Sequence, residues 1–290
     1  MAFQGLFVGL VTLDLVYLTT GLPEQNQKIV ASDYTVAAGG PATNAAVTFS
    51  YLGNRASLLG IVGIHPINCL IRTDLDSHSV TLIDLSPSQS EPPPVSSIIT
   101  TQATGERAAI SINATKTQVS GECLPLNILQ EIDIVLIDGH QMAVGEKIAR
   151  LAKENQIPVV IDGGSWKPGF ERILPFVDYA ICSENFHPPS CDRAQQEVLS
   201  YLSALGIPHI AITGGEKPIQ YLSQGTSGSI EVPQINPVDT MGAGDIFHGA
   251  FCNYILRKSF ADAIASAAKI ASHSCQFFGT RRWMQKTAPK

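Results

Sequence analysis

The chain has 290 residues, of which 44% are hydrophobic and 15% are charged, and its formal net charge at pH 7 is −6. This length is sufficient for one large α/β domain or for two small ones. A nucleic-acid-binding surface normally carries a basic stripe, so we expect no nucleic-acid partner. The only basic cluster lies near the C-terminus, and we interpret it as a solvated tail. Its members are Arg281, Arg282, Lys286 and Lys290.

The six cysteines form no CxxC pair, and their spacings match no zinc site. We therefore expect a reduced, cytoplasmic protein in which most cysteines are small residues of the core. The apolar N-terminal residues 3–18 are interrupted by Asp14 and have neither a basic region nor a small-residue cleavage site. We therefore expect no signal peptide and no membrane span.

Short, continuously apolar segments alternate with helical patterns along the chain. Such segments are typical of strands in a parallel sheet that is covered on both faces, and parallel neighbours need crossover helices. We therefore predict an α/β fold with a doubly wound, mostly parallel sheet and helices on both faces. The predicted strands are residues 6–11, 57–62, 132–138, 158–162, 179–182 and 209–213. The predicted helices are residues 41–52, 145–155, 193–205, 242–256 and 259–275.

Two stretches, residues 28–37 and 96–112, alternate polar and apolar side chains instead. The second is expected to be a hairpin with Thr104 and Gly105 in its turn. Alternating strands have one face in water, so they do not fit a sheet that is buried on both faces. We predict that they form a small antiparallel β lid on a single domain spanning residues 1–290.

Near the C-terminus, residues 239–245 read DTMGAGD and precede an apolar pattern with helical spacing. The glycines leave the backbone amides of this turn unobstructed, and amides at a helix N-terminus attract anions. Phosphoryl transfer needs such charge neutralisation, together with an acid that accepts the proton of the attacking hydroxyl. Asp245 is therefore either a first-turn acid favoured by the helix dipole or a catalytic base beside an anion hole.

This segment resembles the D-T-x-G-A-G-D signature of the ribokinase-like (PfkB) carbohydrate kinases at every fixed position, whereas the chain has no GxxxxGK[ST] sequence. The resemblance implies that Asp245 is the catalytic base and that the backbone of Gly242, Ala243, Gly244 and Asp245 forms the anion hole. It also implies ATP and Mg²⁺ as cofactors, with a monovalent cation such as K⁺ as a further candidate.

A second signature of the family, two glycines followed by an asparagine and a helix, matches Gly39, Gly40 and Asn44. The glycines follow the first predicted lid strand where it returns to the body, so they can serve as a hinge and allow close approach to a sugar. The Asn44 amide can donate to one sugar hydroxyl and accept from another. Asp14 resembles the substrate-binding aspartate of the family, and we place it directly after the first buried strand, where open parallel sheets bind ligands.

Three further charged residues are candidates on the substrate side. Asp138 and Asp162 each close a predicted buried strand, so we expect both to point into the same crevice as Asp14. Arg107, after the lid turn, would reach the substrate or a phosphate if the lid closes. Two simpler roles explain these residues equally well: the two aspartates could only cap turns, and Arg107 could only be an exposed charge on the lid.

On the nucleotide side, residues 212–217 read ITGGEK and resemble the family's strand end T-x-G-x-x-G. Thr213 and Gly215 match, whereas Pro218 stands in place of a glycine. The resemblance implies that this segment lines the ATP site. It also assigns small residues near the C-terminus to the adenine side of the pocket, although helix packing explains them as well. These residues are Ala268, Ser272 and Gly279.

The family's N-x-x-E motif is altered here, because Ser183 stands in the Asn position and Phe186 in the Glu position. Glu184 could substitute through water-mediated contacts to magnesium, which keeps several waters in most protein sites. An ordinary loop explains the segment equally well.

Together these motifs predict an ATP-dependent sugar kinase that binds ATP on its C-terminal side and the sugar between sheet and lid. The alternatives are a nucleoside kinase of the same fold and a catalytically silent sugar or nucleotide sensor. The resemblance further implies a homodimer formed through the β lid. The motifs do not identify the sugar or the hydroxyl that is phosphorylated.

Overall fold

The computed structural model describes residues 2–103, 105, 107–112, 118–189, 191 and 194–285. Its main sheet has nine strands in the order β13-β12-β11-β10-β9-β8-β1-β4-β5. Six consecutive pairings, from β11 across to β5, are parallel, and β12 and β13 join in antiparallel fashion. The strands are β1 (Gln4–Val8), β4 (Arg55–Gly60), β5 (Val80–Asp84), β8 (Ile134–Ile137), β9 (Val159–Gly163), β10 (Tyr179–Ser183), β11 (His209–Gly214), β12 (Lys217–Ser223) and β13 (Thr226–Ile230).

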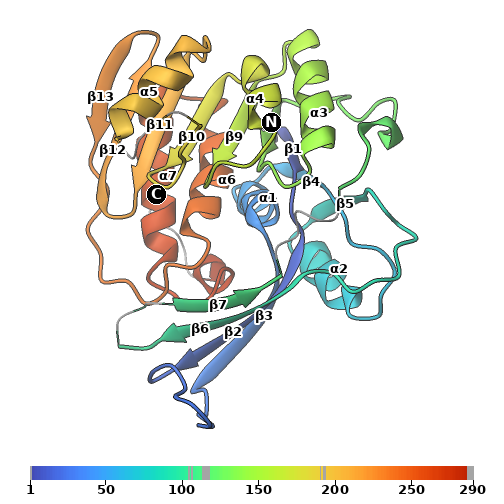
Figure 1. Cartoon of the computed structure of the whole chain (residues 1–290), viewed down its shortest axis with the longest axis vertical. Coiled ribbons are helices and arrows are strands. Elements are labelled where there is room, and N and C mark those ends of the chain that lie inside the picture. Colours follow the sequence, from blue (N-terminus) through green and yellow to red (C-terminus); the bar gives the residue numbers. More distant parts are fainter. Residues whose placement is uncertain are drawn as a thin grey trace.

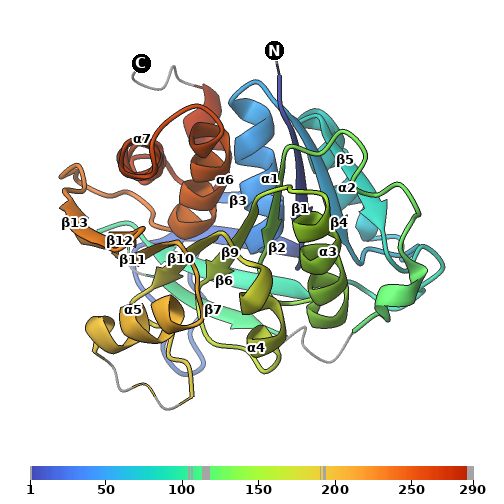
Figure 2. The same ribbon diagram turned by 90° about the horizontal axis from the view of Figure 1, so that it is seen from above.

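Helices cover both faces of the main sheet, as Figure 2 shows. Alternate residues of β1 belong to different hydrophobic clusters, because successive side chains of a strand point to opposite faces. Phe7 packs in the cluster that contains α1, α2, α6 and α7, whereas Leu6 and Val8 pack with α3, α4 and α5. The helices are α1 (Pro41–Tyr51), α2 (Asn68–Ser77), α3 (Met142–Glu154), α4 (Phe170–Ile173), α5 (Gln195–Ala204), α6 (Ala243–Ile255) and α7 (Phe260–Ser274). The predicted α/β fold with helices on both faces is confirmed.

The lid is a separate sheet of four strands below the main sheet in Figure 1, in the order β3-β2-β6-β7. Both outer pairings are antiparallel, and the central β2–β6 pairing is parallel. The inner face packs through Val16 and Ile98 against Met241 and Phe278 of the body. The strands are β2 (Thr12–Thr19), β3 (Asp33–Gly39), β6 (Val95–Thr101) and β7 (Arg107–Ser111).

The structure corrects the expected boundaries at the N-terminus. The first buried strand ends at Val8 rather than at residue 11, and the chain then enters β2, a lid strand absent from the sequence prediction. Residues 3–18 are almost continuously apolar, so their pattern does not mark where the chain passes from one sheet to the other. Consequently Asp14 lies within a lid strand, not in a turn after the first strand.

Other expectations change or lie outside the described residues. The helix predicted from residue 145 begins three residues earlier, at Met142. The interpretation of a solvated basic tail is wrong for Arg281, whose side chain is only 11% exposed and pairs with Asp74. Thr104 in the lid turn, the helix start at Arg193, and Lys286 and Lys290 in the tail are outside the described residues. Within the described ranges, no helix is both long enough and apolar enough to cross a membrane.

Candidate active site

Asp245 lies in the first turn of α6, on the side of the body that faces the lid. Gly242 caps this helix with φ +69°, a left-handed conformation that favours glycine. A β-carbon at Gly242 would also lie 2.8 Å from Cγ2 of Thr280. The turn that presents Asp245 therefore depends on glycine at this position.

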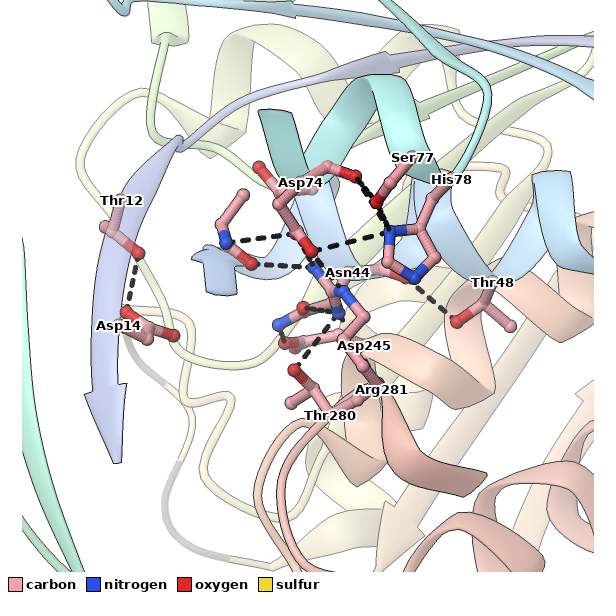
Figure 3. Close-up of polar contacts among 12 residues, drawn as sticks. Thr12, Asp14, Asn44, Thr48, Asp74, Ser77, His78, Asp245, Thr280 and Arg281 are labelled. Atoms are coloured by element: carbon pink, nitrogen blue, oxygen red, sulfur yellow. Dashed lines mark hydrogen bonds and ion pairs between the residues drawn. The ribbon is translucent and has the colours of Figure 1, made fainter. Parts of the chain in front are cut away.

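The Asp245 carboxylate is surrounded by groups from several elements. Nδ2 of Asn44, from α1, donates a hydrogen bond of 2.8 Å to Asp245 Oδ2 (Figure 3). Removal from water raises the pKa of Asp245 to about 7, and the charge of Asp162 adds to this rise. Asn44, His248 and Arg107 oppose it. A carboxyl group with a pKa near neutrality is suited to take up a proton during a reaction.

Backbone amides beside Asp245 are available to an anion. The first hydrogen bond within α6 is donated by the Ile246 amide to the Gly242 carbonyl, at 2.8 Å. The amides of Gly244 and Asp245 precede it, at the positive end of the helix dipole. The Ala243 amide makes a longer bond of 3.3 Å to the Thr240 carbonyl. This part of the turn therefore offers the anion-binding geometry that phosphate groups use in proteins.

Asp14 projects from the inner face of the lid and is buried. Oγ1 of Thr12 donates a hydrogen bond of 2.8 Å to Asp14 Oδ1. A β-carbon at Gly39 would lie 2.0 Å from Asp14 Oδ2, so only glycine permits this approach of the two lid strands. Burial raises the pKa of Asp14, and hydrogen bonds from Thr12 and Ser96 oppose that rise.

Asp138 and Asp162 both accept hydrogen bonds from backbone amides of the chain, and Asp162 also lies close enough to Asp245 to act on its pKa. Oδ2 of Asp138 accepts hydrogen bonds from the backbone amides of Leu10, at 2.8 Å, and Ala42, at 3.2 Å. Burial alone would raise the pKa of Asp138, but His140 and the Leu10 amide outweigh it and hold the pKa at about 2. Asp138 thus supports the chain leading into the lid and the start of α1. Asp162 is also buried, and its Oδ1 accepts from the Gly164 amide.

A largely apolar cavity of about 370 Å³ adjoins the first turn of α6. Residues from three segments line it: the predicted nucleotide-side residues at the end of β11 and in α7, and the expected anion hole at the start of α6. Thr213, Gly215, Ala243, Gly244, Ala268 and Ser272 are among the lining residues. Apolar walls with a few polar groups suit a flat heterocyclic base, and the helix N-terminus at one end suits its phosphates. These residues therefore fit ATP.

Gly279 has a different position from the one expected. Its amide donates a hydrogen bond of 2.9 Å to Asp239 Oδ2, and it lies against Thr35 of the lid strand β3. Gly279 thus belongs to the junction between lid and body and is not among the residues that line the cavity. Gly279 follows α7 by only a few positions, so its place in the sequence suggested the cavity and did not reveal its contact with the lid.

Glu184 is the candidate for water-mediated magnesium contacts. Its Oε2 accepts a hydrogen bond of 2.7 Å from Nζ of Lys217, and the side chain remains partly exposed. Across the part of the chain that the structure describes, no group of three or more His, Cys, Asp and Glu side chains is placed to hold a metal ion. Glu184 therefore remains a single partly exposed carboxylate, which could contact magnesium only through water.

Two residues beside the site were missed by sequence reasoning. His248 is buried, lines the cavity, and holds Nδ1 2.7 Å from the Gly244 carbonyl oxygen and 3.6 Å from Asp162 Oδ2. Its spacing of three residues from Asp245 was a usable signal, since such residues share a helix face. Arg281 contacts Asn44 but is 237 positions away from it, so no local pattern indicates the contact.

Comparisons with known proteins point to one family. Residues 5–287 match the model of the pfkB family of carbohydrate kinases. The chain is 27% identical to a ribokinase of Lactococcus lactis, over 96% of this chain and 93% of that protein. It is 26% identical to a 2-dehydro-3-deoxygluconokinase of Haemophilus influenzae, over 52% of this chain and 55% of that protein.

Solved structures show the same fold. The structure of Arabidopsis thaliana ribokinase complexed with ribose and ATP superposes with a TM-score of 0.76 at 22% identity, covering 99% of this chain and 100% of that one. Ribokinase from Giardia lamblia superposes with a TM-score of 0.80 at 17% identity, covering 98% of both chains.

Proposed function

Because this chain belongs to the pfkB family of carbohydrate kinases and is an ATP-dependent carbohydrate kinase, we propose that Asp245 is its general base. The observation that carries this proposal is the position of the Asp245 carboxylate. It lies at the N-terminus of α6, 2.8 Å from Asn44 and beside amides that precede the helix's own hydrogen bonds. The substrate is a sugar bound between the main sheet and the lid.

In this mechanism the sugar is held by Asp14 and by the Asn44 amide. Asp245 removes the proton from one sugar hydroxyl as its oxygen forms a bond to the γ-phosphorus of ATP, and the bond from that phosphorus to the bridging oxygen breaks. The amides of Gly244 and Asp245 stabilise the negative charge on the transferred group. Magnesium, when bound, neutralises phosphate charge. A closed lid excludes water that would otherwise compete as acceptor.

The activity is expected to fall in acid because Asp245 must be ionised to act as a base. Its raised pKa of about 7 means that the carboxylate takes up a proton as the pH falls through neutrality. The kcat/KM for the sugar should therefore be flat above about pH 8 and drop roughly tenfold per pH unit below about pH 6. Initial rates across this range would check the expectation, and a rate independent of pH down to about pH 5 would contradict it.

An ADP-release assay over a panel of acceptors tests the proposed function directly. The panel begins with ribose and 2-dehydro-3-deoxygluconate, because the similar proteins named above act on these sugars, and it includes purine and pyrimidine nucleosides. Turnover only with sugars supports the proposal. Turnover only with nucleosides would indicate a nucleoside kinase, and none with any acceptor would indicate a silent sensor. Repeating the assay in K⁺ and in tetramethylammonium tests the proposed monovalent cation.

We also propose that the lid joins two copies of the chain. The strand registers place Val36, Leu15, Ser97 and Ile110 in one row across the outer face of the lid, with Tyr34 and Tyr17 beside the first two. Ile110 is 78% exposed and Tyr34 66%. An apolar face of this kind across several strands is typical of an interface.

Sedimentation velocity is expected to give twice the mass of one chain, and Ile110→Lys should shift the protein to a monomer because it places a charge in the apolar interface. Ile64→Lys is the matched control, since Ile64 is 65% exposed but lies outside the lid strands. A monomeric wild-type protein, or an Ile110→Lys variant that remains dimeric, would contradict the proposal.

A further inference from the structure

Arg281 connects three parts of the molecule through one guanidinium group. Its Nη2 donates to the Ala38 carbonyl, at 2.7 Å, and to Asp74 Oδ2, at 3.1 Å. Its Nη1 donates to Asn44 Oδ1 at 2.9 Å and to Thr280 Oγ1 at 3.0 Å. Figure 3 shows Arg281 between Asp74 of α2 and the Asn44–Asp245 pair. The side chains of Arg281 and Asp74 are 11% and 14% exposed, so this ion pair is largely removed from water.

The first consequence concerns the base of the lid. Ala38 precedes Gly39 and Gly40, where β3 returns to the body, and β3 is the terminal strand of the lid order. The Ala38 amide donates to Asp74 Oδ2 at 3.0 Å, and its carbonyl accepts from Arg281. The Arg281–Asp74 pair therefore satisfies both polar groups of Ala38 on this edge, as a neighbouring strand would, and holds the hinge of the lid to α2.

The second consequence concerns the orientation of Asn44. A guanidinium can only donate hydrogen bonds, so it must face the oxygen of the amide, Oδ1. The NH₂ group of Asn44 is then directed to Asp245 Oδ2, at 2.8 Å. The opposite orientation would place an amide oxygen against the carboxylate. Arg281 thus determines which end of Asn44 meets the catalytic base.

We propose that Arg281 is a positioning residue that couples the hinge of the lid to the catalytic base, through Ala38 on one side and Asn44 on the other. The inference rests on the proposed function, because it assigns Arg281 a role in presenting Asp245 to the sugar. A buried ion pair that only stabilises the fold would affect folding but would not act through Asn44. The difference between these two roles can be measured.

The principal variant is Arg281→Met, which keeps much of the side-chain volume but removes every donor. Loss of charge-assisted hydrogen bonds should lower kcat for the sugar about tenfold or more, with the KM for ATP unchanged. Asp245 should also lose its oriented donor, so the midpoint of the pH profile should move up by about half a unit or more. Asp162, His248 and Arg107, the other charged or titratable groups that act on Asp245, are unaltered in this variant. Arg281→Lys should recover part of the activity.

Arg282→Met is the matched control. Arg282 is the next residue and also forms an ion pair, with Asp33, but its side chain is 40% exposed. We expect its kcat and pH midpoint to match those of the wild type.

A double-mutant cycle with Asn44→Ala distinguishes positioning from stabilisation. If Arg281 acts on the base through Asn44, Arg281→Met should cause no further shift of the pH midpoint in the Asn44→Ala background. An equal shift in both backgrounds, or no shift in either, would overturn the coupling. Melting temperatures of all variants show whether each is folded at the assay temperature.

Hydrogen exchange provides a readout that does not need turnover. The backbone amide of Ala38 should exchange at least about tenfold faster in Arg281→Met than in the wild type, because Asp74 loses the partner that holds it. An unchanged exchange rate would overturn the hinge contact even in an active enzyme. Faster exchange in a protein without activity on any acceptor would instead retain the hinge contact and reject the proposed function.

Discussion

Asp245→Asn is expected to lower kcat by about 10²-fold or more while leaving the KM values for ATP and sugar broadly unchanged, because general-base catalysis contributes on this scale. Asparagine has nearly the same shape as aspartate, and its amide oxygen can still accept the hydrogen bond from Nδ2 of Asn44, which is 2.8 Å from Asp245 Oδ2. The substitution therefore removes the proton acceptor with little change to the surrounding structure. Single-turnover and steady-state phosphorylation rates would measure the effect.

Asp262→Asn is a matched control for this prediction. Asp245 and Asp262 are each the third residue of their helix, α6 and α7 respectively. If Asp245 were only a first-turn acid, both substitutions would remove a similar interaction with the helix dipole, worth about 0.3–1 kcal/mol of stability. We expect Asp262→Asn to lose a little stability and to keep its turnover. Asp245→Asn should lose catalysis without losing stability near neutral pH, because burial raises the pKa of Asp245 and so disfavours its charged form. Equal turnover in the two variants would contradict the assignment of Asp245 as a base.

The sequence was sufficient for those parts of the protein that local patterns determine. The buried strands and their crossover helices follow from continuous apolar segments, and the family is recognisable from residues 239–245 and 38–46 alone. The structure and the comparisons confirm the fold class, the family and the kinase activity. The roles of individual residues, the single-domain organisation and the cytoplasmic location stay predictions.

The features that the sequence did not reveal depend on contacts between segments that are distant in the chain. Arg281 and Asn44 are 237 positions apart, and no spacing rule links them. The strand β2 was missed because an apolar segment gives no sign of which sheet it joins. Asp138 resembled a ligand-facing acid because it follows a buried strand, but the sequence does not show that the amides of Leu10 and Ala42 occupy its carboxylate.

Asp14→Ala is expected to reduce kcat/KM for the sugar by about 10²-fold or more, mainly through KM. A buried carboxylate that accepts two hydroxyl hydrogen bonds would lose charge-assisted interactions worth about 1.5–3 kcal/mol each. Thr12→Val is the control, because it removes the 2.8 Å hydrogen bond to Asp14 Oδ1 and leaves the carboxylate in place. Isothermal titration with the sugar and initial-rate kinetics would measure both variants. A fall in kcat with an unchanged KM would contradict the binding role.

The stability of the isosteric variant Asp14→Asn tests whether this carboxylate is retained for binding rather than for folding. Burial raises the pKa of Asp14 above its ordinary value, so folding favours the protonated form. The stabilising contribution of this group is present below the unfolded pKa and is lost as pH rises through the folded pKa. At pH 7, far above the unfolded pKa, the burial of Asp14 therefore lowers the free energy of unfolding. Asp14→Asn, which is neutral at every pH, should melt at the same or a higher temperature at pH 7 while binding the sugar more weakly. A clear loss of stability at pH 7 would instead show that the carboxylate holds the lid strands together.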